Sequence, residues 1–389
     1  MMADRVERVA CFVLAPPRDE PYLGSLRPGE EVNAKGYFVR RGNRTVYPTF
    51  DRSVLVRLTT ADGAIGWGET YGIVAPGAVK AIIEDLLADF VIGRDPFDVA
   101  VVHEDLYDLM RVRGYTGGFY LDALAAIDIA LWDLAGKLAG VPVAKLLGGR
   151  RRERIPAYVS GLPKPTLKER VDFAADWVEQ GFSAVKFAAA VADEGSVEEL
   201  RALRERLGPE VEIAVDLHWK YTASGAIRMI EALHPWRPWF CEAPVKPEDL
   251  EGQVAVARKV STPIALGEEW RTVFDARPRI ERAAAAIVQP EMGRTGITQF
   301  MRIATLAQAH HIEVIPHASV GVGIFLAASL QASSTVQNLP AHEFQHSIFA
   351  KNLRFLAGEM ACAEGFYSLP EGPGLGVEPN EDAIGMLQT

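Results

Sequence analysis

Two hydrophobic patterns divide the chain. Apolar and polar positions alternate over residues 53–58 (SVLVRL), which predicts a strand, and the turn residues 61–63 (ADG) predict a hairpin into residues 65–68. Further on, apolar residues recur every three or four positions in the segments that begin at Ala78 and Leu121, which predicts amphipathic helices. The first part of the chain is therefore predicted to combine strands and helices.

Beyond about residue 155 the pattern changes to short apolar runs, each followed by a helix-like segment. Examples are the runs IAVDL, FCEAP, PIALGE, AIVQPE and VIPHA. This alternation predicts βα units and a parallel sheet. Polar residues end the runs at intervals of 26, 26, 23, 26 and 26 residues, namely Asp216, Glu242, Glu268, Glu291, His317 and Glu343. Units of about 25 residues suit an eightfold βα barrel better than an open sheet.

Three regions follow from these patterns. A chain of 389 residues is long enough for one large domain and one smaller domain. We expect residues 1–150 to form the smaller α+β domain and residues 151–350 to form the barrel. Residues 351–389 return to Gly- and Pro-rich sequence with few apolar runs, so we expect this tail to pack back on the first domain.

Composition and charge narrow the classes of function. The chain has 41 Lys and Arg against 51 Asp and Glu, a formal charge of −10, which opposes binding to nucleic acid or to an anionic membrane. Its three cysteines are far apart and give neither a disulfide framework nor zinc-ligand spacing. The sequence shows no export signal or membrane span. We expect a cytoplasmic protein that binds a small molecule.

Three carboxylates end successive units of the predicted barrel. Asp216, Glu242 and Glu268 would converge on the carboxyl-terminal face, where barrel enzymes build their sites, and would repel one another unless a cation or shared protons neutralised them. Oxygen ligands without cysteine favour a hard cation, with Mg²⁺ preferred over Mn²⁺ or Ca²⁺. The alternative is three unrelated carboxylates, each paired with a local Arg or Lys.

Two histidines and one lysine are further candidates for chemistry. His317 ends the unit after Glu291, so the two side chains could form an imidazole–carboxylate pair suited to a general base, or a purely structural ion pair. His218 lies two residues after Asp216 and would point to the same side of an extended strand. Lys186 ends a strand and could bind an anionic substrate, although a surface role is nearly as plausible.

These residues lie in blocks that resemble the mandelate racemase subgroup of the enolase superfamily over nearly the whole chain. The blocks AIDIALWDLAGK, VDLH, CEAPV, ALGEE, VQPEMGRTGIT and IPHASVGVGIFLAASLQ occur in the order found in that family. The resemblance implies a capping domain over a (β/α)7β barrel and a Mg²⁺ centre. It also implies site roles: Asp216, Glu242 and Glu268 as metal ligands, His317 as base, Glu291 as its dyad partner, and Glu343 as an electrophilic carboxyl group.

Two departures from the family pattern bear on the reaction. Racemases of the subgroup are similar in a Lys-x-Lys motif whose second lysine is the opposing base, whereas here Ala188 follows Lys186 and Phe187. In exchange, His218 is similar to the residue that protonates the leaving hydroxide in acid-sugar dehydratases of the galactonate dehydratase type. The second departure is Glu291, because the dyad usually contains Asp.

The sequence therefore predicts a Mg²⁺-dependent acid-sugar dehydratase in which His317 is the base and His218 is the acid. The alternatives are a racemase, epimerase or cycloisomerase of the same superfamily, a barrel glycosidase that uses paired carboxylates, and a sugar-acid binding protein. The family resemblance suggests a homo-oligomer. The long segment at residues 23–48 carries basic residues that either read a second substrate carboxylate or are simply solvated: Arg27, Lys35, Arg40, Arg41 and Arg44.

Overall fold

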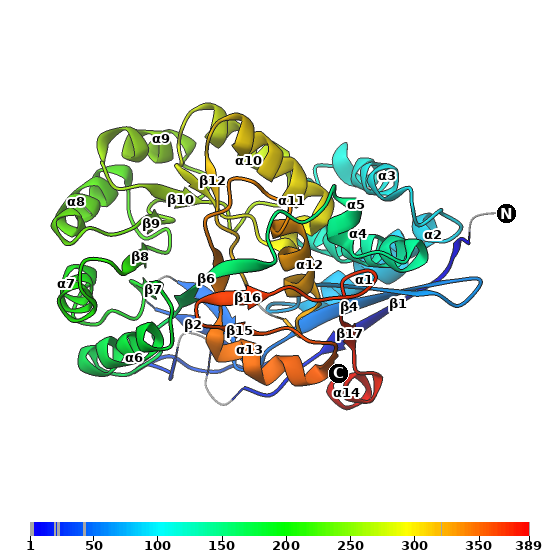
Figure 1. The fold of residues 1–389 in the computed structure, drawn as a ribbon, viewed down its shortest axis with the longest axis horizontal. Helices are drawn as coiled ribbons and strands as arrows, with labels where there is room; N and C mark the ends of the chain where they lie inside the picture. The colour runs from blue at the N-terminus through cyan, green and yellow to red at the C-terminus, as the bar shows by residue number, and fades with distance from the viewer. Residues whose placement is uncertain (1–3, 19–20, 22–23, 42–43, 320, 389) are drawn as a thin grey trace.

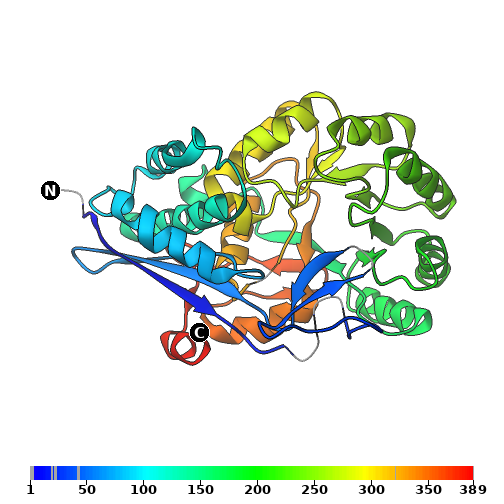
Figure 2. The same ribbon diagram turned by 180° about the vertical axis from the view of Figure 1, so that it is seen from behind.

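The structure is a computed structural model that describes residues 4–18, 21, 24–41, 44–319 and 321–388. It has an N-terminal α+β cap beside an α/β barrel (Figures 1 and 2). The cap is built on an antiparallel sheet in the order β1–β4–β5. Its strands are β1 (Val6–Leu14), β4 (Ser53–Thr60) and β5 (Ile65–Tyr71).

Helices cover one face of this sheet. The predicted helices at Ala78 and Leu121 are present, although both begin earlier than the sequence pattern suggested. The second packs closely on β5, because a Cβ added at Gly68 would lie only 1.8 Å from the Ala126 carbonyl oxygen. The helical segments are α1 (Pro76–Ile82), a π-helical turn (Ile83–Leu87), α2 (Ala88–Val91), α3 (Val99–Arg111), α4 (Gly118–Ala139) and α5 (Val143–Leu146).

Eight parallel strands form the barrel, which confirms the predicted βα repeat. The strands are β6 (Arg154–Ser160), β7 (Ala184–Ala188), β8 (Glu212–Asp216), β9 (Cys241–Glu242), β10 (Ile264–Leu266), β11 (Ile287–Val288), β12 (Glu313–Val314) and β13 (His342–Phe344). The helices that follow them are α6 (Leu167–Glu179), α7 (Ser196–Leu207), α8 (Ala223–Leu233), α9 (Leu250–Lys259), α10 (Val273–Glu281), α11 (Met292–Ala309), α12 (Ile324–Ser333) and α13 (His346–Asn352).

The strand order runs from β12 through β6 to β13, so β13 returns to pair with the first strand of the barrel. The final step between β12 and β13 is not a ladder in the part of the chain that the structure describes. Instead, the Glu343 N–H donates to the Pro316 carbonyl at 3.3 Å. The barrel is therefore complete in strand number but is not closed by a continuous ladder.

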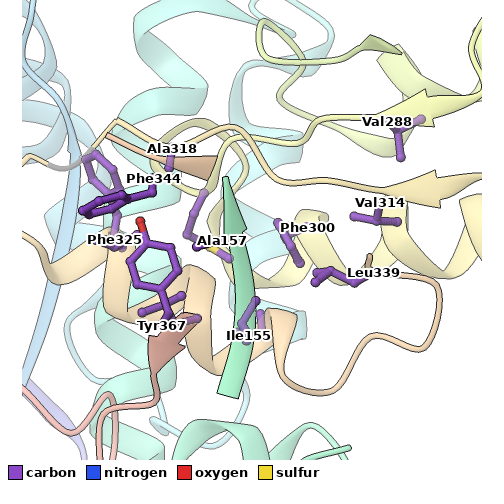
Figure 3. Packing of buried hydrophobic residues seen from close by; sticks show 14 of the residues in the cluster. Ile155, Ala157, Val288, Phe300, Val314, Ala318, Phe325, Leu339, Phe344 and Tyr367 are labelled. Atoms are coloured by element: carbon purple, nitrogen blue, oxygen red, sulfur yellow. The ribbon is translucent and has the colours of Figure 1, made fainter. Parts of the chain in front are cut away.

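One apolar residue from each strand region forms a separate cluster that we interpret as the barrel interior. Bulky and small side chains alternate irregularly in it, as expected for a packed barrel core. Its members are Tyr158, Ala184, Ala214, Phe240, Ala265, Ile287, Ile315 and Ala341. Neighbouring strand residues, such as Ile155 and Ala157, belong instead to the larger core outside the barrel (Figure 3).

The C-terminal tail contacts both parts of the molecule. Strand β16 (Phe366–Ser368) pairs antiparallel with β6, and Tyr367 packs edge to face against Phe344 with ring centres 5.7 Å apart (Figure 3). The last helix, α14 (Glu381–Leu387), ends beside β1, where the Ala15 N–H donates to the Leu387 carbonyl at 3.0 Å. The remaining short elements are the hairpin β2 (Tyr37–Arg40) and β3 (Thr45–Pro48), the helical turns His234–Trp236 and Leu353–Phe355, β14 (Leu356–Ala357), β15 (Cys362–Ala363) and β17 (Glu378–Pro379).

Candidate functional site

The period-2 geometry of the strands explains why the predicted site residues gather. Side chains two residues apart in a strand point to the same face. Five predicted site residues follow a residue of the interior cluster by two positions, so they form the next layer toward the carboxyl end of the barrel. The pairs are Ala184 and Lys186, Ala214 and Asp216, Phe240 and Glu242, Ile315 and His317, and Ala341 and Glu343.

Lys186 is the centre of a buried ion cluster in this layer. Its Nζ lies 2.6 Å from Glu242 Oε2 and 2.9 Å from Glu343 Oε1, and all three side chains are at most 5% exposed. Burial alone would lower the pKa of Lys186, but the charges of Glu242 and Glu343 outweigh it and hold the pKa well above its usual value. The lysine is therefore charged, and it lines the barrel mouth together with Glu343.

Asp216 and His218 form a second pair on the loop after β8. The His218 N–H donates to Asp216 Oδ1 at 2.8 Å, and His218 Nδ1 lies 2.9 Å from Asp216 Oδ2. Burial lowers the pKa of His218, whereas Asp216, Glu268 and Glu242 raise it, to about 9. His218 and Trp219 both have positive φ, 48° and 49°, so this turn carries the backbone strain that often marks functional loops.

His317 contacts both its predicted partner Glu291 and the predicted metal ligand Glu268. Its Nδ1 lies 2.5 Å from Glu291 Oε2, and its Nε2 lies 3.0 Å from Glu268 Oε2 and 3.7 Å from Glu343 Oε2. Burial lowers the pKa of His317, but Glu343, Glu268 and Glu291 together raise it well above 6.5. The predicted contact between His317 and Glu291 is therefore present.

The longer side chain of Glu291 is held by groups that the sequence did not reveal. The Tyr71 hydroxyl, from β5 of the cap, lies 2.8 Å from Glu291 Oε2 and 2.6 Å from Ser319 Oγ. The Ser319 N–H donates to the same Glu291 oxygen at 3.0 Å. Tyr71 ends a strand in a different domain, and nothing in the local sequence pattern distinguishes it from a packing residue.

The donor set fits a hard divalent cation. Glu242, Glu268 and His317 each offer a ligand atom, and these atoms lie within 4.8 Å of one another. Glu242 Oε1 is buried and has no hydrogen-bond partner, which is costly unless a cation or a solvent molecule meets it. Asp216 is not part of this group, although its charge is close enough to raise the pKa of Glu242. Two of the three carboxylates named from the sequence, Glu242 and Glu268, thus lie in one group with His317.

A cavity of about 670 Å³ opens over this layer, a size typical of small-molecule sites. None of the basic residues expected from the early segment is among its described lining residues. Arg40 is fully buried against Glu30 at 2.8 Å, and Arg27 lies 2.8 Å from Asp193. The cations that do line the cavity were not predicted, apart from Lys186: Arg18, Arg271, Arg294 and Lys351.

Several characterised proteins are similar to this chain. It is 34% identical to D-galactarolactone cycloisomerase of Agrobacterium fabrum over 86% of this chain and 91% of that protein. It is 33% identical to D-galactonate dehydratase of Pectobacterium atrosepticum over 87% of this chain and 92% of that protein. Both alignments span almost the whole of each relative.

Solved structures show the same fold. A candidate isomerase from Sinorhizobium meliloti matches with a TM-score of 0.98 and 65% identity over 99% of this chain and 100% of its own. A racemase from Streptomyces coelicolor A3(2) with bound magnesium matches with a TM-score of 0.85 and 26% identity, again over 99% of this chain and 100% of its own.

Two family descriptions cover most of the chain in the expected order. Residues 45–148 match the mandelate racemase/muconate lactonizing enzyme N-terminal domain, and residues 169–383 match the enolase C-terminal domain-like family. The boundary between them falls where the cap gives way to the barrel. The chain therefore belongs to the mandelate racemase/muconate lactonizing enzyme family of the enolase superfamily.

Proposed function

We propose that this protein is a Mg²⁺-dependent acid-sugar dehydratase that converts a polyhydroxy acid into a 2-keto-3-deoxy acid. The observation that carries the proposal is the placement of His317 and His218. They line one cavity from β12 and β8, which are four strands apart in an eight-stranded order, and so face each other across the barrel mouth. The matched dehydratase and cycloisomerase relatives support an acid sugar as substrate.

His317 is the proposed base. Its Nδ1 is held by Glu291, which fixes the ring and directs Nε2 toward the carboxylates at the barrel mouth. The substrate Cα–H bond breaks, its proton passes to Nε2, and the electron pair forms an enediolate. Glu291 then stabilises the imidazolium, and Tyr71 and Ser319 keep Glu291 in position.

Glu242 and Glu268 would hold the metal, with Asp216 as the third proposed ligand. When bound, the ion supplies positive charge beside the substrate carboxylate and so lowers the cost of removing the α-proton. Because Glu268 is among the groups that raise the pKa of His317, neutralising Glu268 would lower that pKa and leave more of the imidazole unprotonated and able to accept the α-proton. Lys186 contributes a fixed positive charge beside Glu242.

We propose a supporting role for Glu343. The family resemblance implies an electrophilic carboxyl group, which would donate a hydrogen bond to the enediolate if it were protonated. Burial raises the pKa of Glu343, but Lys186 and His317 outweigh burial and hold the pKa below its usual value. Glu343 is therefore ionised and accepts hydrogen bonds, including one from the Ala318 N–H at 2.8 Å. Its proposed role is to orient Lys186 and the loop that carries His317.

His218 is the proposed acid for the second half of the reaction. Without a bound cation its pKa of about 9 keeps a proton on it at neutral pH, and a cation at Asp216, Glu242 and Glu268 would lower that pKa and make the proton easier to release. As the Cβ–O bond breaks, this proton passes to the leaving hydroxyl group, water departs, and the resulting enol tautomerises to the keto acid. In this proposal His317 removes the α-proton and His218 donates the proton to the leaving group.

The second candidate is a cycloisomerase, favoured by the 34% identity to D-galactarolactone cycloisomerase. The same base would act, and His218 would protonate a ring oxygen instead of a hydroxyl group. A racemase with two opposed bases is less favoured because Ala188 replaces the second lysine. A glycosidase is disfavoured because Glu242 and Glu268 are engaged by Lys186 and His317.

The test is proton NMR in D₂O with Mg²⁺ and separate pools of linear acid sugars and their lactones, with EDTA as the control. We expect a linear acid to give a deuterated 2-keto-3-deoxy acid and EDTA to abolish the reaction. Conversion of lactones alone would establish the cycloisomerase instead. Hydrolysis of glycosides that is indifferent to EDTA would contradict both proposals.

A further inference from the structure

Arg294 differs from the cations around it in the cavity. Arg18 pairs with Asp51 at 2.5 Å, Arg271 pairs with Asp122, and Lys186 pairs with Glu242 and Glu343. Among the described residues, no carboxylate oxygen lies within 4.0 Å of the Arg294 guanidinium, and its buried Nε has no hydrogen-bond partner. Burial would lower the pKa of Arg294, but the more distant charges of Asp122 and Glu291 help to raise it, so a charged guanidinium with an unmet Nε–H lies on the cavity wall.

The local fold holds this guanidinium in place. Arg294 lies in the first turn of α11, where its N–H donates to the Glu291 carbonyl at 3.0 Å. Its guanidinium lies over the Tyr71 ring, 4.5 Å from the ring centre, a cation–π contact that fixes its plane. The side chain is therefore pre-organised, although no carboxylate among the described residues is close enough to form an ion pair with it.

The nearest acid on that wall is already engaged. Both oxygens of Asp122, in α4 of the cap, accept hydrogen bonds from Arg271, at 2.8 and 3.2 Å. Glu269 has a buried Oε1 without a hydrogen-bond partner, but it lies beyond ion-pair distance from Arg294. The cavity wall near Arg294 thus also carries Arg271, from the loop before α10, and the carboxylate of Asp122 that Arg271 already binds.

The position of Arg294 relative to Lys186 indicates how a substrate would lie in the cavity. Arg294 follows β11, whereas Lys186 lies on β7, and the two strands are four apart in the order β7–β8–β9–β10–β11. In an eight-stranded barrel they face each other across the mouth. A substrate held at one end beside Lys186 and the proposed metal ligands would extend toward Arg294 at its other end.

We propose that Arg294 binds a second anionic group of the substrate, a carboxylate remote from the reacting α-carbon, so that the preferred substrates are diacids such as aldarates. This inference rests on the proposed acid-sugar function. Arginine suits the task because its planar fork can hold a carboxylate with two parallel hydrogen bonds. A terminal hydroxymethyl group would offer the guanidinium no charged hydrogen-bond acceptor.

The test compares an aldarate with the aldonate of the same chain length and configuration in the presence of Mg²⁺. Calorimetric affinity and kcat/KM are measured for the wild-type protein, Arg294→Gln, Arg294→Lys and the control Arg302→Gln. Arg302 lies on the same helix but pairs with the exposed Glu104 outside the cavity. We expect Arg294→Gln to lose about 10- to 100-fold for the diacid and less than about 3-fold for the monoacid. Arg294→Lys should lose less, and the control should not change.

Equal losses for both acids, or no loss for the diacid, would overturn the role of Arg294. A wild-type protein that turns over only monoacids would also overturn it while leaving the proposed function intact. Conversely, Arg294-dependent binding of the diacid without any Mg²⁺-dependent turnover would support the subsite and contradict the proposed function. Absence of wild-type binding to either acid would overturn the inference as well.

Discussion

Lys186 at the barrel mouth and Arg40 in the early segment are both buried cations, yet their surroundings differ. Among the described residues, Arg40 pairs with Glu30 and donates to the carbonyls of Gly24 and Ser25, at 3.0 and 3.1 Å. Lys186 serves two carboxylates at once, and one oxygen of Glu242 has no hydrogen-bond partner. Arg40 is thus neutralised by a carboxylate of its own segment, whereas the barrel mouth holds excess negative charge that a bound cation would neutralise.

The largest effect is expected for Lys186→Met. The substitution leaves Glu242 and Glu343 buried without their shared cation, which should lower the free energy of unfolding by about 5 kcal/mol. Mg²⁺ should restore part of that loss, because an ion that binds only the folded state stabilises it by mass action. Urea unfolding with and without Mg²⁺ measures both. Equal stability of the variant under the two conditions would contradict the excess of negative charge at the barrel mouth.

A smaller effect is expected for Arg40→Met. It leaves one buried carboxylate unpaired and should cost about 3 kcal/mol, with no recovery in Mg²⁺. Adding Glu30→Gln should recover part of the stability by removing the unpaired charge. Because Arg40 does not line the cavity, kcat/KM should stay close to the wild-type value. A selective loss of affinity for diacids would mean that the early segment does bind the second carboxylate of the substrate.

The smallest effect concerns Glu69, a cap residue that accepts hydrogen bonds from barrel N–H groups of Ile324 and Phe325, at 2.9 and 3.1 Å. Burial raises its pKa from 4.5 to about 7, despite these hydrogen bonds. The folded protein thus keeps this proton to a higher pH than the unfolded chain, so stability falls as the pH rises through this window.

From pH 5 to pH 8 this group should remove about 2.5 kcal/mol, and Glu69→Gln should abolish that part of the pH dependence. Urea unfolding at the two pH values measures it, with the exposed Glu205→Gln as the control. An unchanged pH dependence in Glu69→Gln would show that the buried carboxyl group is ionised throughout. The contact between cap and barrel would then contain a buried charge that its neighbours stabilise, as Glu30 stabilises Arg40 in the early segment.

Local sequence patterns were sufficient for the barrel and for most of the layer at its mouth. The short apolar runs mark the strands, and the period of 2 places Lys186, Glu242 and Glu343 on the inner face. The contact between Glu291 and His317 follows from adjacent strands. These features depend on residues within one βα unit or the next, so they can be predicted from the local sequence pattern.

The missed features depend on contacts between distant segments. Tyr71 reaches Glu291 across 220 residues of sequence, and its contact exists only because the cap docks on the barrel. The segment at residues 23–48 has a basic composition that suggested a ligand, but the partners of Arg27 and Arg40 become visible only in the fold. Composition alone cannot distinguish a paired charge from an unpaired one.

The most direct test of the account is deuterium exchange at the substrate α-carbon in D₂O, followed by NMR in the Mg²⁺-loaded wild-type protein, His317→Asn and His218→Asn. We predict that His317→Asn loses exchange by at least about 100-fold. His218→Asn should continue to exchange the α-proton while it loses elimination. Exchange at the wild-type rate in His317→Asn would contradict the assignment of the base, and with it the central claim about the barrel mouth.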